Sequence, residues 1–170
     1  MKKRSRIISV IPVYNGEKYI LETLESLASQ TLKPDRIIVL DDGSTDQTAQ
    51  LVEAYKSFNC ELIRGVENQG LFKNFNRALD YAPECDFLHF VCADDILLPK
   101  FMEQMSNALQ NATGQSFSYC LSAFINKDGK LIESPTNHSY PPYSVSTNAL
   151  LAQHSECKSL MLGGTLIKTL

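Results

Sequence analysis

The stretch Arg36-Ile37-Ile38-Val39-Leu40-Asp41-Asp42-Gly43-Ser44 places an apolar run directly before two adjacent aspartates. A second stretch, Asp86-Phe87-Leu88-His89-Phe90-Val91, is followed closely by Ala93-Asp94-Asp95. Both apolar runs are typical of buried strands. Adjacent carboxylates repel each other and lose water on burial, and ligands of open α/β sheets bind at the carboxyl ends of the strands. The two acidic pairs therefore predict a site for a divalent cation and a polar, phosphorylated ligand.

The composition is that of a globular protein with one domain. The chain has 170 residues, of which 44% are hydrophobic and 21% charged. Its net charge of -3 gives no basic face, so we expect no nucleic-acid partner. No run of about 18 apolar residues is present, which predicts no transmembrane helix. The five cysteines match no zinc pattern and suit a reducing compartment. We expect a cytoplasmic protein, free or at the inner face of the cell membrane.

Strand and helix patterns alternate four times before residue 112. Continuous aliphatic runs favour strands that are buried on both faces, as in parallel sheets. This alternation predicts an α/β fold, with a mostly parallel, Rossmann-like central sheet flanked by helices. The predicted strands are Ile7–Ile11 (ended by Pro12), Ile37–Leu40, Cys60–Arg64 and Asp86–Val91; the predicted helices are Glu17–Gln30, one opened by a capping box from Ser44 to Gln47, one after Gly70 with Leu71, Phe75, Ala78, Leu79 and Ala82 inward, and one near Pro99 with Phe101, Met105 and Leu109 buried.

The pattern changes after Gly114. Residues 117–125 alternate like a strand, and Asn126–Lys130 has the composition of a hairpin turn before a returning strand at 131–133. We expect a loop over 134–146, a short helix over 147–153 and a last strand over 161–168.

Several motifs leave two interpretations open. Pro12-Val13-Tyr14-Asn15-Gly16 lacks the glycines of a dinucleotide-binding turn or a P-loop. It is either a turn with Asn15 as helix N-cap or a nucleotide site with Tyr14 at the base. Ala93-Asp94-Asp95 either caps a helix or supplies the oxygen ligands that Mg²⁺ and Mn²⁺ prefer.

The pair Asp41-Asp42 is harder to explain as a turn, because one aspartate suffices for a turn and the second has no evident structural role. A receiver domain has its acidic pair after the first strand, which is not the order here. The polar loop Asn68-Gln69-Gly70, with Asn76, precedes a helix and suits phosphate. His89 sits in an apolar strand and is expected to be a core histidine.

Four motifs occur in order: residues 8–15, Asp41–Asp46, Asn68–Gly70 with Asn76–Leu79, and Ala93–Pro99. Together they resemble glycosyltransferase family 2, whose members are inverting enzymes with the GT-A fold of nucleotide-diphospho-sugar transferases. The resemblance is close over residues 6 to about 110. It implies a single glycosyltransferase domain over 1–170, with a nucleotide-sugar-binding half to about 112 and the start of an acceptor half from about 113.

The resemblance also implies roles for residues. Its donor site would contain Asp42 as acceptor of a hydrogen bond from the base and Asp94 as the main ligand of Mn²⁺ or Mg²⁺, supported by Asp95. The implied partners are a nucleotide-diphospho-sugar donor and a saccharide, lipid-linked or small acceptor. The full set of implied donor-binding residues is Pro12, Tyr14, Asn15, Asp42, Lys73, Asn76, Ala93 and Asp94.

This chain departs from the family pattern in three ways. Cys92 replaces the first aspartate of the metal motif, and Phe75 stands where an arginine is frequent, so Lys73 would supply the charge. The acidic motif with the catalytic base follows a strand resembling 162–167, which places the base beyond Leu170. We therefore expect the 170 residues alone to transfer sugar poorly. Two alternatives are a non-catalytic nucleotide-sugar-binding module and a nucleotidyltransferase, which would need a glycine-rich loop after the first strand.

Overall fold

A computed structural model describes residues 4–110, 112, 116–120, 123–133 and 165–169. The chain divides into two compact units, residues 1–119 with 162–170, and residues 120–161. Within the described residues, no helix has both the length and the apolar character needed to cross a bilayer.

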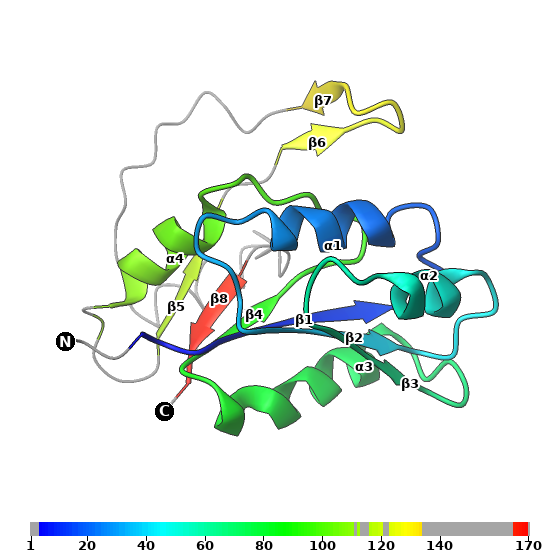
Figure 1. Ribbon diagram of the computed structural model, residues 1–170, viewed down its shortest axis with the longest axis horizontal. Helices are drawn as coiled ribbons and strands as arrows, with labels where there is room; N and C mark the ends of the chain where they lie inside the picture. The colour runs from blue at the N-terminus through cyan, green and yellow to red at the C-terminus, as the bar shows by residue number, and fades with distance from the viewer. Residues whose placement is uncertain (1–3, 111, 113–115, 121–122, 134–164, 170) are drawn as a thin grey trace, which may run out of the picture. The chain divides into compact units, whose positions relative to one another are not determined.

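The first unit is built on a six-stranded sheet in the order β3-β2-β1-β4-β8-β5 (Figure 1). The first four strands in that order run parallel, while β8 is antiparallel to both of its neighbours. This arrangement confirms the predicted mostly parallel sheet. The strands are β1 (Ile7–Val13), β2 (Arg36–Asp41), β3 (Cys60–Arg64), β4 (Phe87–Phe90), β5 (Ser116–Tyr119) and β8 (Thr165–Lys168).

Helices cover both faces of this sheet (Figure 1). Because side chains alternate along a strand, β1 sends Ile7 and Ile11 into one apolar cluster, and Ile8 and Val10 into another. The first cluster is completed by α1 (Ile20–Ala28), α2 (Thr48–Ala54) and α4 (Phe101–Leu109). The second is completed by α3 (Leu71–Ala78) and the 3₁₀ helix η1 (Leu79–Glu84). The predicted α/β fold with flanking helices is therefore confirmed.

The strand β1 continues through Pro12, where the sequence predicted its end. Pro12 lies opposite Leu40 of β2. The carbonyl of Val13 accepts a hydrogen bond of 2.8 Å from the Asp42 N–H, so the peptide groups of Val13 face β2. The peptide groups of Pro12 face the side of β4. There, however, the pairing of β1 with β4 has already ended at Val10 and Phe90. The missing N–H of Pro12 thus removes no bond between β1 and β2.

The second unit contains a hairpin of β6 (Phe124–Ile125) and β7 (Leu131–Glu133). Gly129 takes a φ of 75° in the turn, which confirms the predicted hairpin. A single strand over 117–125 was the wrong expectation, because β5 and β6 belong to different sheets. Alternation shows that a segment is extended but does not reveal its partner. The expected loop at 134–146 and helix at 147–153 lie outside the described residues.

Candidate functional site

A cleft of about 370 Å³ opens at the carboxyl ends of β1 and β4. Three segments form its walls: the loop after β1, the first turns of α3 and the loop after β4. It brings together five of the predicted site residues and places Asp42, Lys73, Asn76 and Asp95 outside its lining. The lining residues are Pro12, Val13, Tyr14, Asn15, Gly16, Tyr19, Leu71, Phe75, Cys92, Ala93 and Asp94.

A second hollow, of about 400 Å³, lies at the opposite ends of the strands. Its charged groups already have partners: Arg6 donates to the Glu84 carbonyl at 3.0 Å, and a carboxylate oxygen of Asp35 accepts from the Ile7 N–H at 2.8 Å. These contacts join the starts of neighbouring elements. We therefore assign the hollow a structural role and take the cleft at the carboxyl ends as the candidate site.

Of the two aspartates after β4, Asp94 lines the cleft and Asp95 does not. The Asp94 carboxylate is exposed and makes no hydrogen bond among the described residues, whereas Asp95 is half-buried. Burial, and next the charge of Asp94, raise the pKa of Asp95. Burial and the same two carboxylates raise the pKa of the Cys92 thiol to about 12. No group of three or more His, Cys, Asp or Glu side chains suited to a metal occurs within the described part of the chain.

The two aspartates at the carboxyl end of β2 have different hydrogen-bond partners. Asp42 is 4% exposed, and its Oδ2 accepts hydrogen bonds from the backbone N–H groups of Gln69 (3.0 Å) and Gly70 (2.9 Å). Asp42 therefore holds the loop that leads into α3. The expectation that the second aspartate of the pair has no structural role was wrong.

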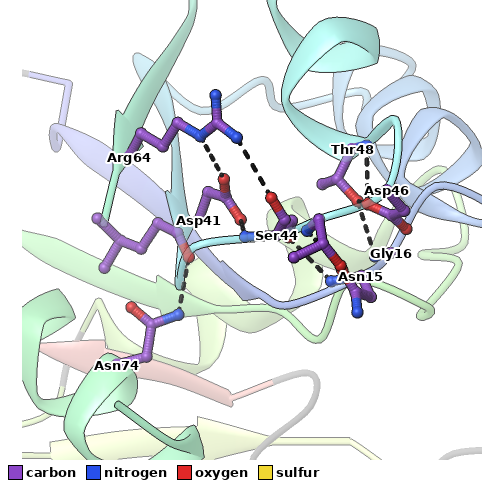
Figure 2. A network of polar contacts seen from close by, with 10 residues as sticks. Asn15, Gly16, Asp41, Ser44, Asp46, Thr48, Arg64 and Asn74 are labelled. Carbon is purple, nitrogen blue, oxygen red and sulfur yellow. Dashed lines mark hydrogen bonds and ion pairs between the residues drawn. The ribbon is translucent and has the colours of Figure 1, made fainter. Parts of the chain in front are cut away.

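Asp41 is fully buried, and its carboxylate lies between Ser44 and Arg64 (Figure 2). Its Oδ1 accepts from the Ser44 N–H at 2.9 Å, and its Oδ2 lies 3.4 Å from Nε of Arg64. The Arg64 side chain is 54% exposed and also donates to the Ser44 carbonyl at 3.2 Å. The ion pair thus compensates the buried carboxylate and closes the turn after β2.

The loops after β1 and β2 are joined by hydrogen bonds that we call the clasp, defined by Asn15, Gly16 and Glu17 on one side and residues 44–48 on the other. Figure 2 shows the part of the clasp around Asn15, Gly16, Ser44 and Thr48. The N–H groups of Asn15, Gly16 and Glu17 donate to side chains of the second loop. In return, Asn15 and Glu17 accept from backbone N–H groups of the second loop. The bonds are Asn15 N to Ser44 Oγ (2.9 Å), Gly16 N to Thr48 Oγ1 (2.8 Å), Glu17 N to Asp46 Oδ2 (3.1 Å), Thr45 N to Asn15 Oδ1 (2.9 Å) and Gln47 N to Glu17 Oε2 (2.9 Å).

The clasp corrects two predicted helix caps. Asn15 has a φ of 53°, and α1 begins later, at Ile20 instead of Glu17, so Asn15 is not its N-cap. Ser44 does not cap α2, which begins at Thr48 with Gln47 at the N-cap position. Both side chains bond across to the neighbouring loop, an interaction that local sequence cannot reveal.

The two asparagines of α3, Asn74 and Asn76, differ in burial. Asn76 and Lys73 are exposed, whereas Asn74 is buried and donates from Nδ2 to the Leu40 carbonyl at 2.7 Å. The predicted inward position of Leu71 and Leu79 was wrong, because they are 62% and 52% exposed. Leu71 lies at the first turn, in the cleft wall, and Leu79 lies where α3 changes to η1.

Six lining residues were not among the predicted site residues: Val13, Gly16, Tyr19, Leu71, Phe75 and Cys92. Two signals could have pointed to three of them. Tyr19 and Leu71 are large apolar side chains beside strand-end loops, and Phe75 follows Leu71 by one helical turn. Phe75 also stacks on Phe90 with ring centroids 5.9 Å apart, so β4 supports this wall.

His89 occupies the core as expected. It is fully buried, with Nδ1 3.0 Å from the Ser9 hydroxyl and its ring 5.1 Å from that of Phe101. Burial lowers the pKa of His89 to about 3, so the side chain is neutral at physiological pH.

Comparison with known proteins gives matches over most of the chain. The family model for "Glycosyl transferase family 2" matches residues 9–157. The poly(ribitol-phosphate) β-N-acetylglucosaminyltransferase TarS of Staphylococcus aureus is 42% identical over 92 residues, 52% of this chain and 16% of TarS. Chondroitin synthase of Escherichia coli is 28% identical over 157 residues, 89% of this chain and 22% of the synthase.

A solved structure supports the same relationship. The crystal structure of residues 1–349 of S. aureus TarS in complex with UDP-GlcNAc has a TM-score of 0.62 and 29% identity, covering 81% of this chain and 37% of that one. This likeness confirms the predicted GT-A fold. The chain spans 16% to 22% of the length of the two curated relatives.

Proposed function

We propose, from the premise that this chain belongs to glycosyl transferase family 2, that it binds a nucleotide-diphosphate sugar in the cleft at the carboxyl ends of β1 and β4. Within the whole protein, the sugar is transferred with inversion to a saccharide, lipid-linked or small acceptor. The observation that carries this proposal is the juxtaposition of an aromatic wall at Tyr14 and an exposed carboxylate at Asp94 in one cleft.

The charge of the cleft argues for a divalent cation. Among its described lining residues none is Lys, Arg or His, while Asp94 contributes a carboxylate. A diphosphate bound there would lie near the Asp94 carboxylate, and no positive side chain of the lining would compensate the two negative charges. Like charges repel more strongly at a protein surface than in bulk water, because the effective dielectric constant is lower. One exposed aspartate with a second beside it fits Mg²⁺ or Mn²⁺, which are commonly held by one or two carboxylates plus substrate phosphates.

In this proposal Asp94 and Asp95 hold the cation. When bound, the cation stabilises negative charge on the diphosphate leaving group as the anomeric bond breaks. Asp94 would face the diphosphate end of the donor, and Tyr14 would lie against the nucleoside.

The other proposed donor contacts assume the same placement of the donor, with its nucleoside at Tyr14 and its diphosphate at Asp94. Pro12 and Asn15 border the nucleoside beside Tyr14, and Ala93 lines the wall next to the diphosphate. Both loop contacts of Asp42 are made by Oδ2, which leaves Oδ1 to accept a hydrogen bond from the base. Lys73 and Asn76, exposed on α3, are proposed to contact the donor from outside the described lining.

The relatives guide the choice of donor. Because TarS was crystallised with UDP-GlcNAc, a uridine nucleotide is the first donor to test. Both curated relatives carry names of sugar-transferring or polysaccharide-forming enzymes. We therefore favour a transferase over a non-catalytic nucleotide-sugar-binding module. A cytoplasmic location, free or at the inner membrane face, stays a prediction.

Titration calorimetry tests the donor site. UDP, GDP and dTDP are titrated into the protein with Mn²⁺, with Mg²⁺ and after chelation by EDTA. We expect binding of at least one nucleoside diphosphate with either ion and a loss of affinity after chelation. Equal affinity with and without metal would contradict the role of Asp94 and Asp95. No binding of any of the three in any buffer would contradict the donor site itself.

A further inference from the structure

The clasp delivers its hydrogen bonds to one short piece of backbone. Ser44, Thr48 and Asp46 accept from three consecutive N–H groups, those of Asn15, Gly16 and Glu17. These three residues directly follow Tyr14, whose side chain is 46% exposed in the cleft. The backbone that carries the aromatic wall is therefore tied to the loop after β2 at every residue of this piece.

The two hydroxyl acceptors of the clasp, Ser44 and Thr48, are buried. Ser44 is 3% exposed and Thr48 is fully buried, and neither lines the cleft. The Thr48 hydroxyl has a defined orientation, because it donates to Asp46 Oδ1 while it accepts from Gly16. Asp41 fixes Ser44 in turn through the Ser44 N–H. The second loop is thus a preformed set of acceptors.

The conformation of the first loop needs such a support. Asn15 takes a φ of 53°, in the left-handed region that asparagine adopts more readily than most residues other than glycine. Its side chain accepts from the Thr45 N–H and its own N–H donates to Ser44, so both ends of the residue are held in this conformation. Loss of the clasp bonds would remove these restraints on the backbone that directly follows Tyr14.

We infer that Ser44 and Thr48 are positioning residues for the donor nucleoside: they hold Tyr14 against the cleft before any ligand arrives. This inference rests on the proposed function. Ordering a side chain on binding lowers affinity, and a loop that is already ordered avoids that loss. Removal of one clasp bond should therefore weaken nucleoside binding by about threefold to tenfold. The diphosphate end, which Asp94 serves, should be unaffected.

Paired variants of Thr48 separate positioning from general stability. Thr48→Val keeps the branched shape and removes the hydroxyl, whereas Thr48→Ser keeps the hydroxyl and is the matched control. Calorimetry compares UDP with inorganic diphosphate, both with Mn²⁺. For Thr48→Val we expect a Kd for UDP about threefold to tenfold higher and an unchanged Kd for diphosphate. Thr48→Ser should restore the wild-type Kd for UDP. Ser44→Ala repeats the test at the bond to Asn15, should Thr48→Val fail to fold.

A spectroscopic experiment tests the clasp without any ligand. The chain has no tryptophan, so Tyr14→Trp introduces a single indole at the cleft. Its fluorescence anisotropy should fall when Thr48→Val is added and should not fall when Thr48→Ser is added. If wild-type protein binds no nucleoside diphosphate, the proposed function fails, and the anisotropy still decides whether the clasp holds the loop. An unchanged Kd for UDP in a folded Thr48→Val protein would overturn the inference, and so would an equal loss of UDP and diphosphate affinity.

Discussion

Two segments border the cleft, and they differ in how their polar groups are satisfied. In the loop after β1, consecutive N–H groups from Asn15 to Glu17 are bonded by the clasp. In the segment after β4, the backbone is anchored, since the Ala93 carbonyl accepts from Thr23 Oγ1 at 2.9 Å. The exposed Asp94 carboxylate, however, has no hydrogen bond within the described part of the chain.

This difference assigns separate tasks to the two segments. A fully bonded loop gains little from a ligand and mainly presents a surface of fixed shape. A carboxylate without a hydrogen bond to the protein can bind a cation or a ligand without breaking an existing contact. We therefore expect substitutions in the clasp to act on stability and nucleoside affinity, and substitutions of Asp94 to act on metal-dependent affinity alone.

The largest effect is expected from Asp94→Asn. Loss of the charge should weaken Mn²⁺-dependent binding of UDP about 100-fold, since charge-assisted contacts of this kind are worth about 1.5–3 kcal/mol and the cation would lose its main protein ligand. Calorimetry measures the change. Asp80→Asn, an exposed carboxylate on η1, is the matched control and should bind like wild type. Equal affinities of wild type and Asp94→Asn would contradict the assignment.

A second experiment compares Asp41→Ala with Asp94→Ala in urea denaturation. Asp41→Ala leaves the Ser44 N–H without its acceptor and removes the partner of Arg64, so the free energy of unfolding should fall by about 2–3 kcal/mol. Asp94→Ala removes an exposed group and should change it by less than about 0.5 kcal/mol. Similar losses in both variants would show that Asp94 contributes as much to folding as Asp41, which closes the turn after β2.

Acidification offers a third test, because it separates loss of folding from loss of binding. Burial lowers the pKa of His89 to about 3 in the folded state, against about 6.5 in the unfolded chain. Below pH 6.5 the unfolded chain binds a proton that the folded protein does not, so stability falls with pH by about 1.4 kcal/mol per unit. At pH 5 this amounts to about 2 kcal/mol.

The variant His89→Asn isolates that contribution. It keeps a polar atom near the Ser9 hydroxyl and removes the titration. Urea denaturation at pH 7 and pH 5 should give a smaller loss for His89→Asn than for wild type, by about 2 kcal/mol. Parallel losses would mean that other groups cause the acid sensitivity. Binding experiments on the cleft are therefore best done at pH 7 or above, where His89 is neutral in the folded protein and mostly neutral in the unfolded chain.

The smallest effect is expected from Asp42→Asn. A neutral oxygen still accepts from Gln69 and Gly70 but more weakly, so stability should fall by about 1 kcal/mol. If Asp42 also accepts from the base, affinity for UDP should fall by a similar amount. A change in stability with unaltered affinity would assign Asp42 to the loop before α3 alone.

Local sequence patterns predicted much of the fold. The aliphatic runs from Ile7 and Ile37 identified buried strands, and Phe101, Met105 and Leu109 identified the inner face of α4. Asp94 could be placed at the carboxyl ends of the strands, because the parallel strands of a sheet end on the same side. The errors lie where side chains have more than one plausible partner, as with Asn15 and Ser44, which bond across loops and not within their own helices.

By itself, the sequence determined the α/β alternation, the parallel core strands and the presence of acidic pairs after β2 and β4, because period and residue type are local properties. The tertiary structure alone decided which carboxylates are already bonded. Asp42 and Asp94 both follow buried strands, yet Asp42 meets the N–H groups of Gln69 and Gly70, while Asp94 faces the cleft. The physical reason is that a carboxylate's partners are set by which distant backbone folds against it, and neither spacing nor composition records that contact.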